Sequence, residues 1–559
     1  MSQECYIKIQ EMIQVGAIAQ ADHIFKTMDI SEKESCENIL SLSADLKKAR
    51  VMRERGTKRQ GLAIETAKAY ERVFIKTGGY YSGINTATMY SIVGNKDKAS
   101  AIARDVIEKI KTASRVPGVY AYNSLAAQAQ AHLIIGDADS AENALRDAIE
   151  LDPHNYGNHA KTLREFEIIQ SILGETTEWL MPLRPPSVLH LSGFSFTLND
   201  DSTVNREALN QLNYLVTDFL QSQNIGMAFG SLAAGSDIVI AEILMAMDIE
   251  FHAVLPCPTE LFDSMSLTPF GNEWRHRYDA CLGQATSIRY VSSDRTVLDP
   301  LTQILASEIA MGLATLQADH YATKAIQLLV SNTNNKHIDS IKKYDEALWS
   351  KSGYEQCVIP LDISAAPVAI SNIGTKHSGT RSLKAMLFMD VKDYSTLSER
   401  QVSTFIEQVF TELSIVTQAY EEQISYINTW GDGIFIALDS VKSAALLALE
   451  IQQTFNDIDM TAAGYPEGIG MRIGAHYGPV HSVNDPFMNR QGLFGREVSF
   501  AARIEPVTVS GSIYVSEAFA CALAVVSQGN FRTEYISNLH ISERETTVRL
   551  FALTKKDYC

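Results

Sequence analysis

The chain has few cysteines, and none of them stands in a spacing that a metal or redox motif requires. Its 559 residues include seven cysteines, scattered from Cys5 to Cys559 with no Cys-x-x-Cys pair. An odd, dispersed set argues against a disulfide framework and against a zinc module. We therefore expect a reduced, cytoplasmic protein.

Long hydrophobic runs and clusters of basic residues are also missing. The N-terminal residues do not begin a signal peptide, and the most apolar stretches, such as 238–247, are interrupted by acidic residues within helix length. A formal net charge of −18 disfavours nucleic acids and anionic membranes as partners. With 46% hydrophobic and 20% charged residues the composition is ordinary for a globular protein, and the length allows three or four domains.

Residues 1–180 are expected to form a TPR-like helical repeat region. Two segments share an alanine, a glycine turn and a second alanine: Ala87 to Gly94 with Ala99, and Ala129 to Gly136 with Ala141. Small residues at helix crossings and glycine at the turn are typical of such repeats. The stretch from Tyr80 to Asn85 also resembles the TRAFs-binding helical region of apoptosis-signal-regulating kinases. The resemblance implies a protein partner, and a plain helical bundle without one is the alternative.

Residues 186–330 are expected to form an α/β domain with a parallel sheet, because strand and helix patterns alternate along them. The predicted strands span 188–191, 226–229 and 251–255, and the predicted helices span 206–223 and 236–247. A small-residue loop follows the second strand, and such loops can direct backbone amides at a phosphate. Its candidate ligand-binding residues are Gly230, Ser231, Gly235 and Ser236.

This α/β pattern resembles the SLOG superfamily of Rossmann-like domains. The resemblance implies a sensor domain with a nucleotide-derived ligand, although the loop has neither the lysine of a P-loop nor a GxGxxG fingerprint. Helix capping by Ser236 or Asp237, with no ligand, is equally open. Residues 331–382 are expected to form a polar helix and a linker rich in Ser, Gly and Thr.

The strongest chemical signal lies in residues 383–559. Asp390 closes the apolar run that begins at Ala385, and Asp432 lies in an Asp-Gly hairpin between two strand-like segments. Two carboxylates brought together supply the hard oxygen ligands of a paired Mg²⁺ site for phosphoryl chemistry. Taken alone, Asp432 could equally be an ordinary turn residue.

Two further motifs follow in the chain. Residues 470–478 are expected to form a strand, and residues 495–505 a helix on which Ser499 and Arg503 share a face. Arg503 could be only a surface partner of Glu497 or Glu505. His476 lies on the apolar strand, which favours a structural role near a dimer seam over a catalytic one.

In this order the motifs resemble the catalytic domain of class III adenylate and guanylate cyclases. The matching segments are Phe388 to Ser395, Gly431-Asp432, Arg472 to Gly478 and Val498 to Arg503. The resemblance implies conversion of a nucleoside triphosphate to a 3′,5′-cyclic nucleotide and pyrophosphate, in composite sites shared by a homodimer. Both aspartates of each site would come from one subunit and the arginine from the other. The predicted fold is therefore multidomain: an all-α helical repeat, an α/β Rossmann-like parallel sheet, and an α+β ferredoxin-like cyclase domain.

The resemblance also implies roles for single residues. Asp390 and Asp432, with the carbonyl of Val391, would hold two Mg²⁺ or Mn²⁺ ions. Arg503 would stabilise charge on the transferring phosphorus, and Ser499 takes the place of the family's ribose-orienting Asn. The expected triphosphate-binding residues are Lys392, Asp393, Tyr394 and Ser395, with Arg544 in place of a C-terminal lysine. Asp393 stands where the family usually has glycine, and it adds a negative charge.

The positions that read the base depart from the family pattern. Asn428 stands where Lys or Glu is common, and Gly492 where Asp or Cys is common. ATP is the expected substrate only because adenylate cyclases are frequent in the family. The alternatives are a catalytically reduced, nucleotide-binding signalling scaffold, favoured by these departures, and a purely structural scaffold.

Overall fold

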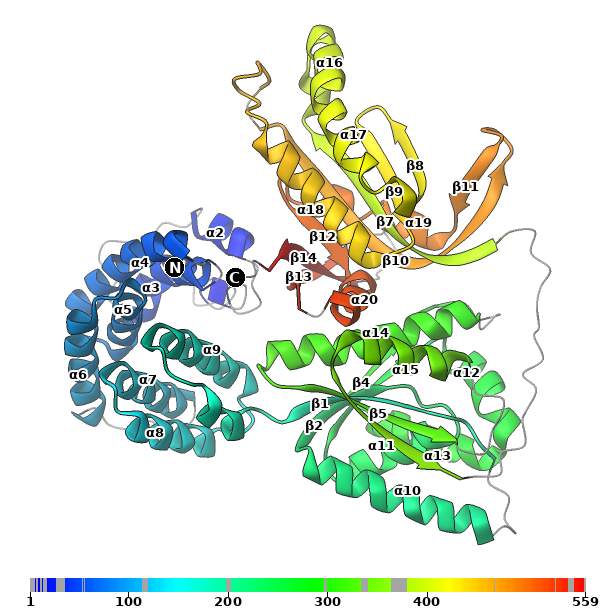
Figure 1. The fold of residues 1–559 in the computed structure, drawn as a ribbon, viewed down its shortest axis with the longest axis horizontal. Helices are drawn as coiled ribbons and strands as arrows, with labels where there is room; N and C mark the ends of the chain where they lie inside the picture. Colours follow the sequence, from blue (N-terminus) through cyan, green and yellow to red (C-terminus); the bar gives the residue numbers. More distant parts are fainter. Residues whose placement is uncertain are drawn as a thin grey trace.

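A computed structural model of the chain describes residues 6, 9–10, 13, 18–26, 36–52, 54, 56–112, 119–197, 203–295, 299–332, 340–362, 380–466, 468–527, 529–540 and 547–556. Figure 1 shows three parts: a curved array of helices, a sheet covered by helices, and a second sheet that carries long strands. The expected linker, 371–380, lies outside the described residues except for Thr380.

The N-terminal part is helical throughout its described residues, as expected. Its elements are α2 (Ile18–Lys26), α3 (Glu37–Val51), α4 (Gly56–Thr77), α5 (Tyr80–Val93), α6 (Lys96–Thr112), α7 (Val119–Ile135), α8 (Ala138–Leu151), α9 (Tyr156–Leu173) and the 3₁₀ helix η1 (Glu178–Leu183).

The two segments that the sequence predicted to be related form two helical hairpins, α5–α6 and α7–α8. Gly94 and Gly136 end the first helix of each hairpin with φ of +85° and +84°, a left-handed conformation that glycine adopts without strain. The four alanines at the helix crossings, Ala87, Ala99, Ala129 and Ala141, are all buried. The hairpins thus share one construction, and the TPR-like label stays a prediction.

The middle part is a parallel sheet of six strands in the order β4-β3-β2-β1-β5-β6. Its elements are β1 (Ser187–Gly193), α10 (Thr203–Ser222), β2 (Ile225–Gly230), α11 (Ser236–Ala246), β3 (Glu250–Leu255), α12 (Thr259–Ser266), η2 (Thr268–Phe270), α13 (Asn272–Gln284), β4 (Ser287–Tyr290), α14 (Pro300–His320), β5 (Ala325–Asn332), α15 (Ser340–Ser352) and β6 (Glu355–Leu361). All five predicted elements occur within a few residues of their expected bounds.

The sheet extends beyond the expected domain boundary at residue 330. That boundary falls inside β5, and β6 pairs with β5 in parallel register from Ile326 to Asn332. The polar helix expected after residue 330 is α15, and it packs against β1 and β6 of the sheet. The sequence signal for β6 is weak because Pro360 interrupts it, and Pro is tolerated there since β6 is an edge strand.

The C-terminal part is a mixed sheet in the order β13-β14-β12-β10-β7-β9-β8, with β11 paired to β10. Its strands are β7 (Thr380–Lys392), β8 (Ile424–Trp430), β9 (Gly433–Leu438), β10 (Gly470–Asp485), β11 (Arg490–Phe494), β12 (Ile513–Ser516), β13 (Phe531–His540) and β14 (Thr547–Lys555). Its helices are η3 (Tyr394–Thr396), α16 (Glu399–Phe405), the π-helix η4 (Ile406–Phe410), α17 (Thr411–Gln418), η5 (Glu421–Gln423), α18 (Val441–Asp457), α19 (Arg496–Ala501), η6 (Glu505–Val507) and α20 (Glu517–Ser527).

The two faces of this sheet are covered differently. Alternate residues of β7, including Leu387 and Met389, join the core beneath α18 and α20. Their neighbours Met386 and Phe388 face the opposite side, toward α19. Because side chains alternate along a strand, Asp390 continues the face of Met386 and Phe388. The catalytic candidates are therefore displayed on the side of the sheet away from the large helices.

Helix α14 joins the two sheets (Figure 1). It packs on β1 and β2 of the parallel sheet and on α20 of the C-terminal part. At the crossing, a Cβ placed on Gly312 would lie 2.3 Å from the Cα of Cys521, so only glycine allows this approach. One hydrophobic core runs through both parts and includes Val188 and Phe519. The middle and C-terminal parts are thus in intimate contact.

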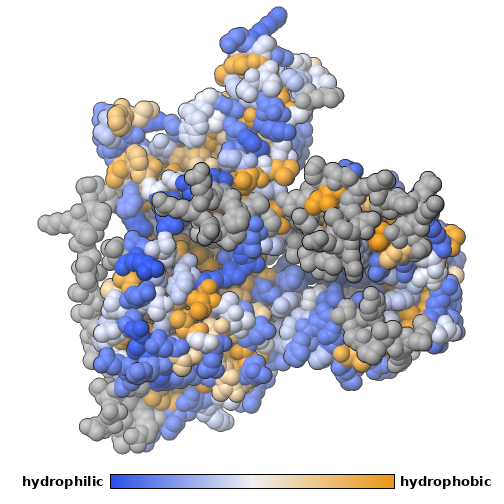
Figure 2. All heavy atoms as spheres, turned by 180° about the vertical axis from the view of Figure 1, so that it is seen from behind, coloured by the Kyte–Doolittle hydropathy of each residue, from blue (hydrophilic) through white to orange (hydrophobic). Residues whose placement is uncertain are grey.

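None of the described helices has the length and apolar run needed to cross a bilayer. On the face seen in Figure 2, hydrophobic side chains are scattered in small groups among hydrophilic ones.

Candidate active site

The structure brings Asp390 and Asp432 together. Asp390 is near the end of β7, which is longer than the short strand expected, and Asp432 lies in the turn between β8 and β9. Burial raises the pKa of Asp432, and the adjacent charge of Asp390 raises it further. The backbone of Val391 hydrogen-bonds to the Asp432 carboxyl and acts in the opposite direction. The two carboxylates are neighbours, as the sequence predicted.

Two residues that the sequence reasoning did not assign complete this cluster. Arg472 of β10 faces Asp390 in the antiparallel register and donates a hydrogen bond to its Oδ2 at 2.5 Å. The Nε atom of Arg472 lies 2.8 Å from Oε1 of Glu505. Burial raises the pKa of Glu505 to about 7; Arg472 opposes this shift, and the charges of Asp390 and Asp432 add to it. The signal was present, because Arg472 opens the motif that the sequence singled out.

These carboxylates fit a divalent cation. Burial and then repulsion by the Asp390 carboxylate raise the pKa of Asp432, and a bound cation would relieve that repulsion. Carboxylate oxygens are the ligands that Mg²⁺ and Mn²⁺ prefer. Among the described residues no group of three or more His, Cys, Asp or Glu side chains is arranged as a metal site. The aspartate pair would therefore need other ligands, such as phosphate oxygens, backbone carbonyls and water.

The turn expected to hold the triphosphate follows β7 directly. Asp393 has φ +64°, a left-handed conformation that glycine adopts freely and that Asp tolerates better than most residues. The ammonium of Lys392 lies 3.6 Å from the Asp393 carboxylate and partly balances its charge. The pKa of Tyr394 is raised by burial and by the charge of Asp432, so Tyr394 lies beside the aspartate pair. Ser395 is exposed, and Arg544 lies outside the described residues.

Helix α19 is shorter than expected. It spans Arg496–Ala501, and Arg503 lies in the turn that follows. The prediction that Ser499 and Arg503 share one regular helix was therefore wrong. Both side chains are exposed. The helix stops early because the chain enters a turn and then the 3₁₀ helix η6, which contains Pro506.

The carboxylates that could have paired with Arg503 are engaged elsewhere. Glu497 accepts from His476 at 2.8 Å, and Glu505 lies against Arg472. No ion pair of Arg503 occurs among the described residues. An exposed guanidinium without such a partner fits a role toward an anionic ligand better than a structural one.

His476 is held within the domain. Its Nδ1 lies 2.8 Å from the Ser516 hydroxyl and its Nε2 lies 2.8 Å from the Glu497 carboxylate. Phe500 packs against the ring, with 4.6 Å between centroids. Both ring nitrogens are therefore occupied, which agrees with the structural role expected for this buried residue.

The residues expected to read the base lie on two different strands. Asn428 is on β8 and Gly492 on β11. Arg490, which the sequence reasoning missed, donates a hydrogen bond from its guanidinium to Oδ1 of Asn428 at 2.6 Å. Only the tertiary fold reveals this contact, since the two residues are far apart in the sequence.

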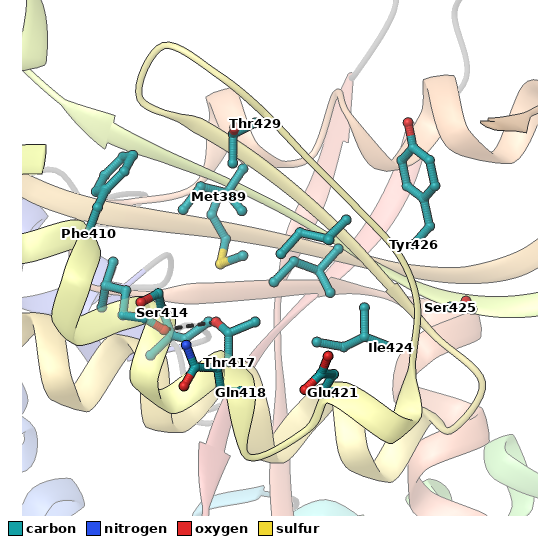
Figure 3. A pocket seen from close by; sticks show the side chains of 15 residues that line it. Met389, Phe410, Ser414, Thr417, Gln418, Glu421, Ile424, Ser425, Tyr426 and Thr429 are labelled. Atoms are coloured by element: carbon teal, nitrogen blue, oxygen red, sulfur yellow. Dashed lines mark hydrogen bonds between the residues drawn. The ribbon is translucent and has the colours of Figure 1, made fainter. Parts of the chain in front are cut away.

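A pocket of about 620 Å³ lies between α17 and the hairpin formed by strands β8 and β9 (Figure 3). It lies on the helix-covered face of the sheet, and its lining is largely apolar. The side chains seen around it include Met389, Phe410, Thr417, Glu421 and Ile424. The pocket is therefore separate from the face that carries Asp390.

The expected ligand loop of the middle part is largely buried. The backbone N–H and the hydroxyl of Ser236 both lie 3.2 Å from the carbonyl of Phe194 and donate to it. A Cβ on Gly235 would lie 2.7 Å from that same carbonyl oxygen. Gly230 is also buried, and Ser231 is half-buried. The loop is thus closed over by the segment after β1, and ligand binding there stays a prediction.

Comparison with known proteins supports the resemblance of the C-terminal part to nucleotide cyclase catalytic domains. Residues 380–554 match the family model described as "Adenylate and Guanylate cyclase catalytic domain". An adenylate cyclase of Schizosaccharomyces pombe is 23% identical over 199 residues, which cover 32% of this chain and 11% of that protein. The chain therefore spans only about a tenth of the length of this curated relative.

Similar solved structures include the adenylyl cyclase CyaB from P. aeruginosa, at 15% identity and a TM-score of 0.29, covering 32% of this chain and 98% of that one. They also include the guanylate cyclase domain of RhGC from Catenaria anguillulae in complex with GTP, at 20% identity and a TM-score of 0.28, covering 32% and 100%. The matched residues include the aspartate pair, Arg472 and Arg503. Residues 380–554 therefore form an adenylate and guanylate cyclase catalytic domain.

Proposed function

We propose that the chain is a class III nucleotidyl cyclase that converts a nucleoside triphosphate to a 3′,5′-cyclic nucleotide and pyrophosphate. The observation that carries the proposal is the pairing of Asp390, near the end of β7, with Asp432, in the β8–β9 turn, within a domain of this family. In the reaction the ribose 3′-oxygen loses its proton and bonds to the α-phosphorus, while the bond from that phosphorus to the bridging oxygen breaks. Pyrophosphate is the leaving group.

The proposed reaction assigns a separate role to each group of site residues. Asp390, Asp432 and the Val391 carbonyl would hold two Mg²⁺ or Mn²⁺ ions, which when bound activate the attacking hydroxyl and offset phosphate charge. Lys392 and the turn after it would position the triphosphate. Arg503 would stabilise the charge that develops on the transferring group. ATP is the expected substrate only because adenylate cyclases are frequent in the family.

We also propose that the active unit is a homodimer. The aspartates of one subunit and Arg503 of the other would form each site, so two equivalent sites would result. The exposure of Ser499 and Arg503 supports this proposal, because both are available to a second copy. A SLOG-like sensor and TPR-like interaction region would control how the catalytic domains meet.

The test is to incubate the purified protein with ATP, GTP, CTP and UTP separately, with Mn²⁺, and to identify products by mass spectrometry. A cyclic monophosphate with stoichiometric pyrophosphate is expected from at least one. Retained nucleotide binding without any product would instead favour the catalytically reduced scaffold.

The shared site can be tested by complementation. Asp390→Ala and Arg503→Ala should each lower turnover by about 100-fold or more, whereas the exposed controls Asp457→Ala and Arg400→Ala should not. Mixing the two inactive variants should restore part of the activity through heterodimers with one intact site. Failure of this rescue, when subunit exchange is demonstrated independently, would exclude the composite site.

A further inference from the structure

Arg490 lies beside Asn428 and Gly492, the two positions expected from the sequence to read the base. It begins β11, two residues before Gly492, so the two residues are on the same face of the strand. A Cβ on Gly492 would lie 2.7 Å from Cε2 of Phe494, which leaves no room for an acidic side chain there without a shift. Asn428, Arg490 and Gly492 thus form one corner of the domain, in which the guanidinium of Arg490 contacts Asn428 at 2.6 Å.

This corner presents hydrogen-bond donors. Oδ1 of Asn428 accepts a hydrogen bond from Arg490, and the Nδ2 group of Asn428 is a donor. A guanidinium has donors only, and several of its N–H groups remain beyond the one used. Asp485, which pairs with Arg490 in the antiparallel register, uses Oδ1 to accept from the amides of Phe487 and Met488, where it closes the β10–β11 turn.

An aromatic surface adjoins these donors. Trp430 lies two residues after Asn428 on β8, on the same face, and is 51% exposed. Its ring is 6.0 Å from that of Phe388, which stacks on Phe435 with 4.4 Å between centroids. Exposed aromatic rings stack on any nucleobase, so this surface adds affinity without selecting a base.

We propose that Arg490, oriented by Asn428, selects nucleoside triphosphates whose base carries a carbonyl over those whose base carries an amino group. Guanine offers O6 and N7 as two acceptors to a guanidinium, and uracil offers O4; adenine and cytosine present an amino donor at the corresponding positions. The guanidinium of Arg490 and the Nδ2 group of Asn428 would leave that amino group facing donors. The inference rests on the proposed function, and it replaces the base-rate expectation of ATP with GTP or UTP.

The test uses the full chain and two readouts. Initial rates with GTP, UTP, ATP and CTP are measured with Mn²⁺, and binding of each triphosphate is measured by calorimetry with Ca²⁺ in place of Mn²⁺. GTP or UTP should exceed both ATP and CTP by about tenfold or more, the discrimination typical of a good arginine–base contact. Arg490→Ala should bring the ratio close to one, and Arg490→Lys should give an intermediate ratio because it keeps charge but loses the fork. The control Arg400→Ala should leave it unchanged.

The outcomes separate the two proposals. Preference for ATP or CTP, or a ratio that Arg490→Ala does not alter, would overturn base selection by Arg490. A carbonyl-base preference in binding that depends on Arg490, with no product from any triphosphate, would support the selection and refute the cyclase activity.

Discussion

The charged form of the Asp432 carboxyl is disfavoured in the folded protein. Burial and the charge of Asp390 raise its pKa, so the folded state binds this proton more tightly than the unfolded chain does. The contribution of Asp432 to stability is therefore full at low pH and is lost as the pH rises through the raised pKa. A bound cation should reverse the effect, because it stabilises both carboxylates in their charged form.

We therefore expect Asp432→Asn to melt at a higher temperature than the wild type at pH 7.5 in EDTA. Saturating Mn²⁺ should stabilise the wild type, by about 2.7 kcal/mol at a concentration 100 times the dissociation constant, and should barely affect the variant. Melting curves by differential scanning fluorimetry, with and without Mn²⁺, measure both. Equal Mn²⁺ shifts in the two proteins would show that the ion binds elsewhere.

The contact between α14 and α20 makes the C-terminal part depend on a helix of the middle part. Gly312 brings the two backbones together, and a Cβ there would lie 2.3 Å from the Cα and from the carbonyl oxygen of Cys521. Backbone atoms cannot give way as a flexible side chain can. Any side chain at position 312 must therefore push the helices apart.

Gly312→Ala should lower the free energy of unfolding by about 1–3 kcal/mol, the usual cost of overpacking, despite the higher helix propensity of Ala. Gly283→Ala is the matched control, because Gly283 is also in a helix and a Cβ there meets nothing within 4 Å. That control should be neutral or stabilising. Chemical denaturation measures both, and an equal response of the two variants would contradict the close packing.

At the scale of the whole molecule, the buried carboxyl of Glu308 on α14 connects α15 of the middle part with β10 of the C-terminal part. Glu308 of α14 is 4% exposed, and Tyr344 of α15 donates a hydrogen bond to it. Burial raises the pKa of Glu308 to about 7; hydrogen bonds from Tyr344 and Tyr477 act against this shift, and the charge of Asp345 adds to it. Tyr477 belongs to β10, directly after His476.

The sign of the pH dependence follows from this raised pKa. The carboxyl binds its proton more tightly in the folded state, so its stabilising effect is full below the ordinary value of 4.5 and is lost as the pH rises through about 7. Glu308→Gln should reduce the loss of stability between pH 5 and 8 by up to about 3 kcal/mol. Denaturation at several pH values measures this, with the exposed Glu346→Gln as control. Identical pH profiles for wild type and Glu308→Gln would refute the assignment.

The sequence predicted local elements well where a short pattern decides them. The strands β1, β2 and β3 and the Asp-Gly turn before β9 occur where alternation and turn residues placed them. The sequence predicted strands less well where pairing with a strand far away in the chain determines their length or existence. Strand β7 extends back to Thr380 because β10 pairs with it along its length, and β6 exists because β5 offers an edge.

What the sequence determined by itself is the set of chemical groups: the two aspartates after strands, the arginine expected near the end of a helix, and the absence of any basic run. Those depend on residue identity and local order. Only the tertiary structure decided which groups meet: Arg472 and Glu505 with the aspartates, Arg490 with Asn428, and Glu308 with Tyr477. Such contacts join residues from separate elements, and sequence patterns of one strand or helix carry no information about the register that brings them together.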